Sequence, residues 1–318
     1  MDLDAKCDYF PDGTKMTEQG SSGDLSADRR YEWGQGALAS GDAEGARDLF
    51  SQALELAPDW PPAWFAFAQA LERLGRPDAA RAAYEKCVAL DAADALGAGL
   101  ALARLGGAAA KTAPRAYVKT LFDQYAARFD RHLVEALAYR GPQILCGALA
   151  RADSGRRFAD VLDLGCGAGL FAGAIRDRAE KISGVDLSPA MIEQARAKRL
   201  YDRLAVAELT EFLAAEPAES ADLAAAADVF VYIGDLEPVF AQVFRVLRPG
   251  GLFAFTTQSG AVEKFALGED LRFCHSEAFL RGLATAQGFA VVELFAASTR
   301  RDRGADVPGW AVVLRKCD

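Results

Sequence analysis

The sequence has 318 residues, and at about 150 residues per domain this length predicts two domains, or one large domain with an appendage. Hydrophobic residues make up 51% of the chain and charged residues 25%, which excludes a mostly disordered or fibrous protein. The net charge of −9 has the wrong sign for a surface that follows a phosphate backbone, so we expect no nucleic-acid partner.

The six cysteines are widely spaced and form no CxxC pair, which predicts neither a metal site nor a disulfide framework and favours a reducing cytoplasm. The first thirty residues contain no apolar run of signal-peptide length, and no later stretch approaches the length of a membrane span. We therefore expect a cytoplasmic protein with no membrane partner. Residues 1–26 are rich in Gly, Ser, Asp and Thr, and this composition predicts a mobile polar lead-in.

An internal repeat occupies residues 27–106. The segment that starts at Gly41 aligns with the one that starts at Gly75, 34 residues later, and the same offset pairs Phe50 with Tyr84. This period, with small residues where helices cross and an aromatic residue four positions later, resembles the tetratricopeptide repeat. The resemblance implies two helical hairpins and a capping helix. Such a module either packs or self-associates as a scaffold, or recruits a protein partner.

Glycines and a proline within residues 106–114 interrupt the helical pattern and predict a domain boundary. Residues 107–150 are expected to form a linker and a helical lid, ahead of a second domain over residues 151–318.

Three residues of the expected lid share one helix face, namely Tyr125, Phe129 and His132. Such a face packs in a core more often than it lines a site, and both interpretations stay open. His132 and His275 are the only histidines. If the reaction needs a general base at neutral pH, these two are the first catalytic candidates, with Tyr125 beside them and Phe129 as a substrate contact.

From residue 158 onwards, apolar runs of strand length alternate with helical stretches, which predicts βαβ units and a mainly parallel sheet. Strands are expected at 158–164, 182–186, 203–207, 222–230, 250–257, 289–296 and 309–315. Helices are expected at 169–178, 189–199, 237–247 and 276–286. In such a sheet ligands bind beyond the carboxyl ends of the strands, so the turn after the first strand is the expected binding site.

That turn is rich in glycine. Gly165, Gly167 and Gly169 let the backbone turn tightly and let a ligand approach it, and the following helix presents free N–H groups. Read from Gly167, the run also satisfies the GxGxxA dinucleotide fingerprint, so an NAD-dependent oxidoreductase is an alternative. Asp163 disfavours this alternative, because a carboxylate at that position repels a pyrophosphate but accepts hydrogen bonds from a cationic amine.

A second carboxylate, Asp186, ends the next expected strand about twenty residues after the glycine run, the arrangement that binds two ribose hydroxyls. Asp228 follows the fourth expected strand, and residues 247–251, LRPGG, precede the fifth. Together these motifs closely resemble the class I S-adenosylmethionine-dependent methyltransferases. Their combination with the repeats resembles a predicted bacterial group of methyltransferases that contain tetratricopeptide repeats.

This resemblance implies an α/β fold, a Rossmann-like seven-stranded sheet with a reversed last strand. The sheet would carry S-adenosylmethionine across its carboxyl edge and release S-adenosylhomocysteine. Asp163 would hold the amino group, Asp186 the ribose, and the glycine loop with Cys166 the methionine part. The remaining cofactor contacts would come from Leu187, Met191, Glu208, Leu209 and Asp228, the last near the sulfonium.

The acceptor side is less determined. Residues near the carboxyl edge either face the substrate or only pack: Tyr232, Gln258, Arg301 and Trp310. The charged run at residues 300–303 is most simply a solvated loop. The leading hypothesis is methyl transfer by in-line displacement to a small-molecule acceptor. A protein acceptor recruited by the repeats and a non-catalytic cofactor-binding protein are the alternatives, and no metal is expected.

Overall fold

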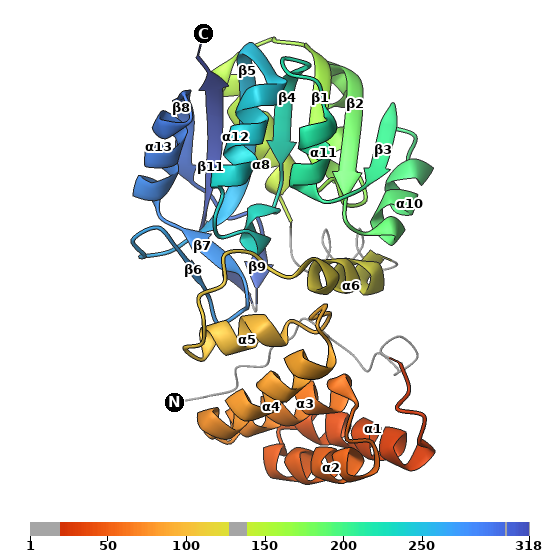
Figure 1. Ribbon diagram of the computed structural model, residues 1–318. Helices are drawn as coiled ribbons and strands as arrows, with labels where there is room; N and C mark the ends of the chain where they lie inside the picture. The colour runs from red at the N-terminus through yellow and green to blue at the C-terminus, as the bar shows by residue number, and fades with distance from the viewer. Residues whose placement is uncertain (1–19, 127–138, 303, 318) are drawn as a thin grey trace. The chain divides into compact units, whose positions relative to one another are not determined.

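The structure is a computed structural model that describes residues 20–126, 139–302 and 304–317 (Figure 1). The chain divides into two compact units. One extends to Ala110 and includes Glu269–Leu271, and the other comprises Lys111–Gly268 and Arg272–Asp318. Among the described residues, no helix combines the length and the apolar character that a membrane crossing requires.

The first unit is built from helices. They are α1 (Leu25–Ala39), α2 (Ala43–Leu56), α3 (Pro61–Arg73), α4 (Pro77–Leu90) and α5 (Ala98–Arg104). This is the expected series of two hairpins and a capping helix. Helix α1 begins inside the stretch whose composition predicts a lead-in, because the Asp24 carboxylate accepts hydrogen bonds from the N–H groups of Ser26 and Ala27 and caps the helix.

The 34-residue offset is visible in the packing of this unit. Phe50 of α2 and Tyr84 of α4 occupy equivalent positions, and both are almost fully buried. Ala46 and Ala80, four residues before them, have no exposed surface, so neighbouring helices approach closely there. Each aromatic residue belongs to its own apolar cluster, as expected for successive repeats.

Two glycines of α1 offer a matched test of this packing. A Cβ added at Gly34 would lie 2.6 Å from Cε1 of the buried Phe50 ring, whereas one added at Gly36 would meet no atom within 4 Å. We expect Gly34→Ala to lower the free energy of unfolding by about 1–3 kcal/mol through overpacking. We expect Gly36→Ala to raise it by about 0.5–1 kcal/mol, because alanine favours the helix. Thermal unfolding of both variants checks this, and shifts of the same sign would contradict it.

The second unit holds a mixed sheet. Its main strands are β1 (Phe158–Leu164), β2 (Ala179–Asp186), β3 (Arg203–Val206), β4 (Ala221–Ala226), β5 (Leu247–Ser259), β8 (Phe289–Ala296) and β11 (Gly309–Lys316). Their order is β3-β2-β1-β4-β5-β11-β8, and β11 runs antiparallel to both of its neighbours. The predicted seven-stranded arrangement with a reversed last strand is therefore confirmed.

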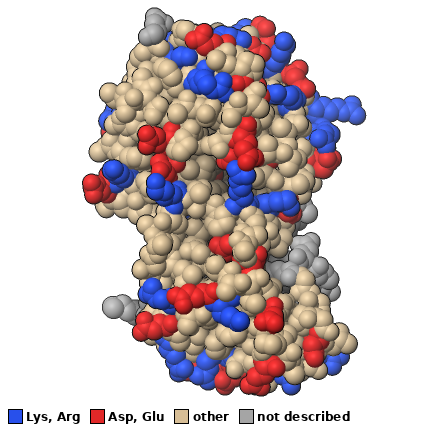
Figure 2. Space-filling model, viewed as in Figure 1, with Lys and Arg blue, Asp and Glu red and all other residues tan. Residues whose placement is uncertain are grey.

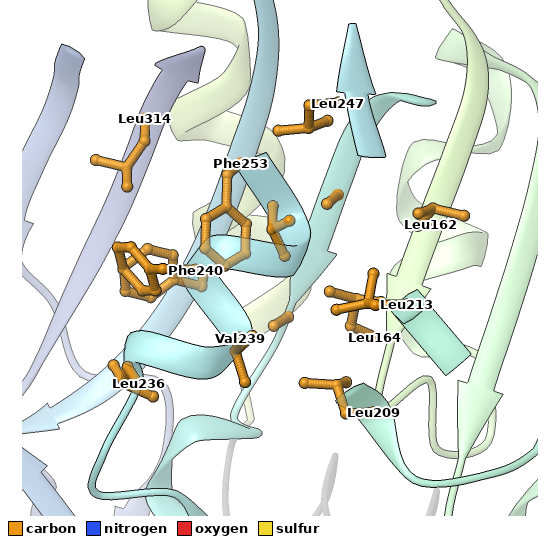
Figure 3. Close-up of a cluster of buried hydrophobic side chains, with 14 of the residues drawn as sticks. Leu162, Leu164, Leu209, Leu213, Leu236, Val239, Phe240, Leu247, Phe253 and Leu314 are labelled. Atoms are coloured by element: carbon orange, nitrogen blue, oxygen red, sulfur yellow. The ribbon is translucent and has the colours of Figure 1, made fainter. Parts of the chain in front are cut away.

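Helices cover both faces of this sheet (Figure 1). Helices α11 (Leu209–Ala215), α12 (Glu237–Val246) and α13 (Glu277–Ala286) pack on one face, and α8 (Gly141–Ala152) and α9 (Leu170–Ile175) on the other. Helix α10 (Pro189–Ala197) follows β2, and α6 (Arg115–Tyr125) precedes α8. The pleat explains how one strand serves two cores, since Phe253 of β5 faces the first helix layer and Ala254 the second. Figure 3 shows Phe253 beside Phe240 of α12 in the first core.

The structure corrects the sequence-based elements in several places. The fourth strand ends at Ala226 and not near residue 230, because Asp228 adopts a left-handed φ of +62° and a 3-10 turn follows over Phe230–Tyr232. Helix α11 was not expected. Two short hairpins were also missed: β6 (Phe265–Leu267) with β7 (Phe273–His275), and β9 (Arg301–Asp302) with β10 (Ala305–Asp306).

Charges of both signs are interspersed on the face shown in Figure 2, and neither sign forms a continuous patch there.

Candidate active site

Three carboxylates come together at the carboxyl edge of the sheet. Asp163 lies at the end of β1, Asp186 ends β2, and Asp228 follows β4. These strands run parallel and are neighbours in the order β2, β1, β4, so their ends meet at one edge. The structure thus brings together the three acidic residues that the sequence predicts around a cofactor.

The glycine loop connects β1 to α9. Gly165, Gly167 and Gly169 have φ values of +66°, +50° and +90°, the left-handed region that side chains other than glycine rarely adopt. At Gly165 space is also lacking, because an added Cβ would lie 2.5 Å from Cγ2 of Val229. Cys166 is almost fully buried, and its N–H donates to the carbonyl of Val185. The backbone of the loop is therefore the surface available to a ligand.

Asp163 is a buried carboxyl group with only 1% of its surface exposed. Its Oδ2 accepts a hydrogen bond of 2.7 Å from the hydroxyl of Tyr201, whereas Oδ1 accepts none from the described residues. Burial raises the pKa of Asp163 to about 7, the Tyr201 hydrogen bond opposes this, and the charge of Asp186 adds to it. A cationic ligand group beside Asp163 would relieve this unfavourable burial of charge.

Asp186 ties the glycine loop to the second strand. Its Oδ2 accepts a hydrogen bond of 2.9 Å from the N–H of Gly167, and its Oδ1 accepts one of 2.9 Å from the N–H of Ser188. Burial raises the pKa of Asp186, and these backbone hydrogen bonds counteract it. Each carboxylate oxygen retains a second lone pair, so Asp186 can accept from two ligand hydroxyls as well.

Asp228 forms hydrogen bonds with three other residues. Nη1 of Arg300 lies 3.1 and 3.0 Å from its two oxygens, and the hydroxyl of Thr299 donates to Oδ1 at 3.2 Å. The N–H of Asp228 donates to Oγ1 of Thr256 at 2.9 Å. Arg300 is only 4% exposed, so the interpretation of its run as a solvated loop is wrong for this residue. The neighbouring Arg301 is exposed and lies 3.8 Å from Asp306.

Tyr139 is a further candidate at this edge, and no sequence motif points to it. The N–H of Arg140 donates to the carbonyl of Thr299 at 2.7 Å, which brings this segment to the edge occupied by Asp228. Burial raises the pKa of Tyr139 well above its ordinary value, and the charge of Asp228 adds to the effect. Tyr139 is therefore a neutral hydrogen-bond donor. The absence of a side chain at Gly141 gives it room, since a Cβ there would lie 2.5 Å from the Tyr139 hydroxyl.

The other expected cofactor residues are Met191, Leu209, Leu187 and Glu208. Met191 has no exposed surface and packs with Ala168 of the glycine loop, and Leu209 is a core residue of the first helix layer. Leu187 is half-buried. Oε2 of Glu208 accepts from the N–H groups of Thr210 and Glu211, so it caps α11. The adenine contact implied for Glu208 would have to share the carboxylate with this cap.

Helix α6, which belongs to the expected linker and lid over residues 107–150, lies near α10 at this edge (Figure 1). Arg115 forms ion pairs with Glu208 and Glu211 at 3.4 and 2.8 Å. Asp123 accepts a hydrogen bond of 2.5 Å from the Ser188 hydroxyl. Tyr125 is half-buried beside the cluster of Ala126, Ala168 and Met191. Phe129 and His132 lie outside the described residues.

The His275 side chain connects two other segments of the chain through hydrogen bonds. It has no exposed surface, its Nδ1 lies 2.6 Å from the Thr257 hydroxyl, and its Nε2 lies 3.0 Å from the Gly234 carbonyl. This geometry assigns the proton to Nε2, and burial lowers the pKa of His275 to about 4. We therefore propose a positioning role for it in place of the catalytic role that its rarity suggests. Trp310 donates from Nε1 to the His275 carbonyl and packs against the core.

Tyr232 and Gln258 remain candidates for acceptor contacts. Tyr232 follows β4, is 8% exposed, and stacks edge-on with Phe122 of α6 at 5.5 Å between ring centroids. Gln258 lies near the end of β5, with its Oε1 3.5 Å from Nη2 of Arg300. Within the described parts of the chain, no cluster of three or more His, Cys, Asp or Glu side chains could hold a metal ion.

Two segments of the chain match known protein families. Residues 162–255 match a family described as a methyltransferase domain, and residues 37–105 match the tetratricopeptide repeat. The matched part of the second unit is similar to a methyltransferase domain. The glycine loop, Asp163, Asp186 and Asp228 all lie within the matched segment, and both family resemblances seen in the sequence are confirmed.

Curated relatives of the methyltransferase domain include malonyl-[acyl-carrier protein] O-methyltransferase of Salmonella typhimurium. It is 38% identical over 104 residues, which are 33% of this chain and 41% of that protein. Methyltransferase-like protein 27 of Homo sapiens is 34% identical over 149 residues, which are 44% of this chain and 57% of that protein. The chain thus spans about half the length of the curated relatives it matches.

Solved structures with the same fold include 1,6-didemethyltoxoflavin-N1-methyltransferase of Burkholderia thailandensis. Its TM-score is 0.50 at 20% identity, and the match covers 66% of this chain and 93% of that one. The N-methyltransferase NodS of Bradyrhizobium japonicum has a TM-score of 0.50 at 19% identity, with 63% and 99% covered. These likenesses confirm the Rossmann-like methyltransferase fold of the second unit.

Proposed function

We propose that this protein transfers a methyl group from S-adenosylmethionine to a small-molecule acceptor. The observation that carries the proposal is the buried carboxylate of Asp163 and the half-buried carboxylate of Asp186, on either side of a loop with three left-handed glycines. The methyltransferase-domain match over residues 162–255 supports the same cofactor. Two structural neighbours were solved with S-adenosylhomocysteine bound.

The side chains present fit such a cofactor. The buried Asp163 needs a cationic partner, which the amino group of the methionine part provides. The Asp186 oxygens can accept from the two ribose hydroxyls while they hold the loop. A Cβ at Gly165 would collide with Val229, so the loop backbone, and not a side chain, forms the floor of the site. The Asp163 carboxylate does not suit a pyrophosphate, which disfavours NAD.

When bound, the cofactor would supply an electrophilic methyl group on a sulfonium. The chain would supply orientation, and holding two reactants in line contributes roughly 7–11 kcal/mol towards lowering a barrier. Arg300 and Thr299 fix the Asp228 carboxylate, which places a negative charge at the carboxyl end of β4. Tyr139 remains protonated, so it is suited to donate a hydrogen bond to the acceptor and not to remove a proton from it.

A thermal-shift titration tests the cofactor. A ligand at a hundred times its Kd stabilises a protein by about 2.7 kcal/mol, and each kcal/mol raises Tm by roughly 2–4 °C in a domain of this size. We expect S-adenosylmethionine and S-adenosylhomocysteine to raise Tm by several degrees, and NAD to leave it unchanged. In the Asp186→Ala variant the shift should disappear. A rise with NAD alone would overturn the proposal.

The acceptor is a separate question, because the repeats favour a second candidate, methylation of a protein that they recruit. Incubation of the enzyme with a cell extract and S-adenosylmethionine labelled on its methyl group distinguishes the two. We expect the label in the small-molecule fraction, as the relatives named O-methyltransferases and N-methyltransferases suggest. A labelled protein band would instead favour recruitment by the repeats.

A further inference from the structure

The loop between α10 and β3 carries a tyrosine that occupies a slot behind the glycine loop. An added Cβ would lie 2.7 Å from the Tyr201 ring at Gly184, and 3.1 Å from it at Gly169. Gly184 lies inside β2, where glycine weakens a strand, and its φ is not in the left-handed region. The backbone of β2 therefore does not require glycine at this position. A side chain at Gly184 would collide most closely with the Tyr201 ring, and it would also lie 3.0 Å from Cys166 Sγ and from Leu204 Cδ2.

In this slot the Tyr201 hydroxyl points toward Asp163. The hydroxyl donates to Oδ2 over 2.7 Å, and Asp163 is 1% exposed, so bulk water does not compete for this bond. Such a bond to a buried carboxylate is charge-assisted and directional. It fixes one oxygen of Asp163, while Oδ1 accepts no hydrogen bond from the described residues.

We propose that Tyr201 is a positioning residue for the cofactor and acts through Asp163. Its hydroxyl holds the carboxylate ionised and oriented for the amino group of S-adenosylmethionine. This inference rests on the proposed function, and it assigns to the methyltransferase site a residue that lies outside the glycine loop and both acidic motifs.

The groups around Asp163 determine its pKa, and the Tyr201 hydroxyl is one of them. Burial raises the pKa of this carboxyl group to about 7, the Tyr201 hydrogen bond lowers it, and the charge of Asp186 raises it again. The Asp163 charge also acts on three neutral groups, which are Cys166 in the glycine loop, Cys146 of α8 and Tyr139. Without the Tyr201 hydroxyl the carboxyl group would bind its proton more tightly and present less charge to an amine at neutral pH.

The Tyr201 hydroxyl stays protonated, and so remains a hydrogen-bond donor, between pH 6 and 9. Burial raises its pKa far above the ordinary value, and the charge of Asp163 raises it further. Any pH dependence that the hydroxyl confers on ligand binding therefore reports the titration of Asp163.

The experiment measures the affinity of the full-length protein for S-adenosylhomocysteine by calorimetry between pH 6 and 9. The variants are Tyr201→Phe and, as a matched control, Tyr84→Phe, which removes a tyrosine-carboxylate bond of 2.6 Å to Glu72 in the repeat unit. The ligand titrates identically with every protein, so the informative quantity is the ratio of wild-type to variant affinity at each pH.

For Tyr201→Phe we expect a ratio of roughly ten at pH 6, because the carboxyl group then binds its proton more tightly, and a smaller ratio at pH 9, where Asp163 is ionised in both proteins and only its orientation differs. For Tyr84→Phe we expect a ratio of one throughout. A Tyr201→Phe ratio that is independent of pH, whether near one or large, would overturn the inference and leave Tyr201 a packing residue. Absence of ligand binding by the wild-type protein at every pH would overturn the proposed function, and this inference with it.

A double-variant comparison keeps the test valid if Tyr201→Phe weakens the fold. Because Tyr201 acts through Asp163, adding Tyr201→Phe to Asp163→Asn should cause no further loss of affinity. A further loss of tenfold or more would contradict the inference.

Discussion

The Asp163→Asn variant is expected to bind S-adenosylhomocysteine measurably but more weakly than the wild type, and yet to unfold at a higher temperature than the wild type above neutral pH. The carboxyl group has a pKa of about 7 in the folded chain, against about 3.9 when unfolded. Its contribution to stability is therefore fully present below about pH 4 and is lost as the pH rises through about 7. Asparagine still accepts from Tyr201 and carries no charge, so it avoids this loss.

The measurement is the Tm of both proteins without ligand from pH 5 to pH 8.5. The advantage of Asp163→Asn should grow with pH to a few kcal/mol, which corresponds to several degrees. Asp177→Asn, an exposed aspartate in the 3-10 turn after α9, serves as the control and should change neither Tm nor affinity. A variant that binds S-adenosylhomocysteine normally would remove Asp163 from the site.

The Arg300→Met variant is expected to destabilise the second unit by about 3 kcal/mol. Breaking a buried ion pair typically costs 3–5 kcal/mol, because the remaining charge is left without a partner. The value lies at the lower end here, since Arg300 is 4% exposed but the Asp228 side chain is 19% exposed. Calorimetric unfolding, which can resolve separate transitions for the two units, measures the loss.

A double variant shows whether the loss comes from the stranded carboxylate. Asp228→Asn in the Arg300→Met background should restore most of the stability, because no unpaired charge then remains. The exposed pair of Arg281 and Glu277 on α13 is the control, and Arg281→Met should cost less than about 0.5 kcal/mol. Additive losses in the double variant would contradict this account of the pair.

The proposed cofactor site could be predicted because its determinants are local in the sequence. A strand, a turn with three glycines and a helix follow one another within residues 158–175, and the carboxylate at the end of the next strand lies in the same βαβ unit. Gly165, Gly167 and Gly169 have positive φ values, which favour glycine. The residue type alone therefore indicates this backbone conformation. The 34-residue repeat was visible for the same reason, since each hairpin repeats one local pattern.

Other parts of the site depend on contacts between distant residues. Arg300 reaches Asp228 across 72 positions, and Tyr201 reaches Asp163 across 38. No local pattern distinguishes Arg300 from the exposed Arg301 beside it. An isolated glycine in a strand, Gly184, was the one available signal for the Tyr201 slot.

By itself the sequence determined the two domain types, the positions of most strands along the chain and the residues of the glycine loop. These follow from periodicity and from backbone geometry, which act over a few residues. Only the tertiary structure decided which charges are buried. It therefore decided the raised pKa of Asp163, the hydrogen bonds of His275 and the ion pair of Arg300 with Asp228. The physical reason is that burial and the neighbouring charges depend on which strand ends and loops the folded chain brings together.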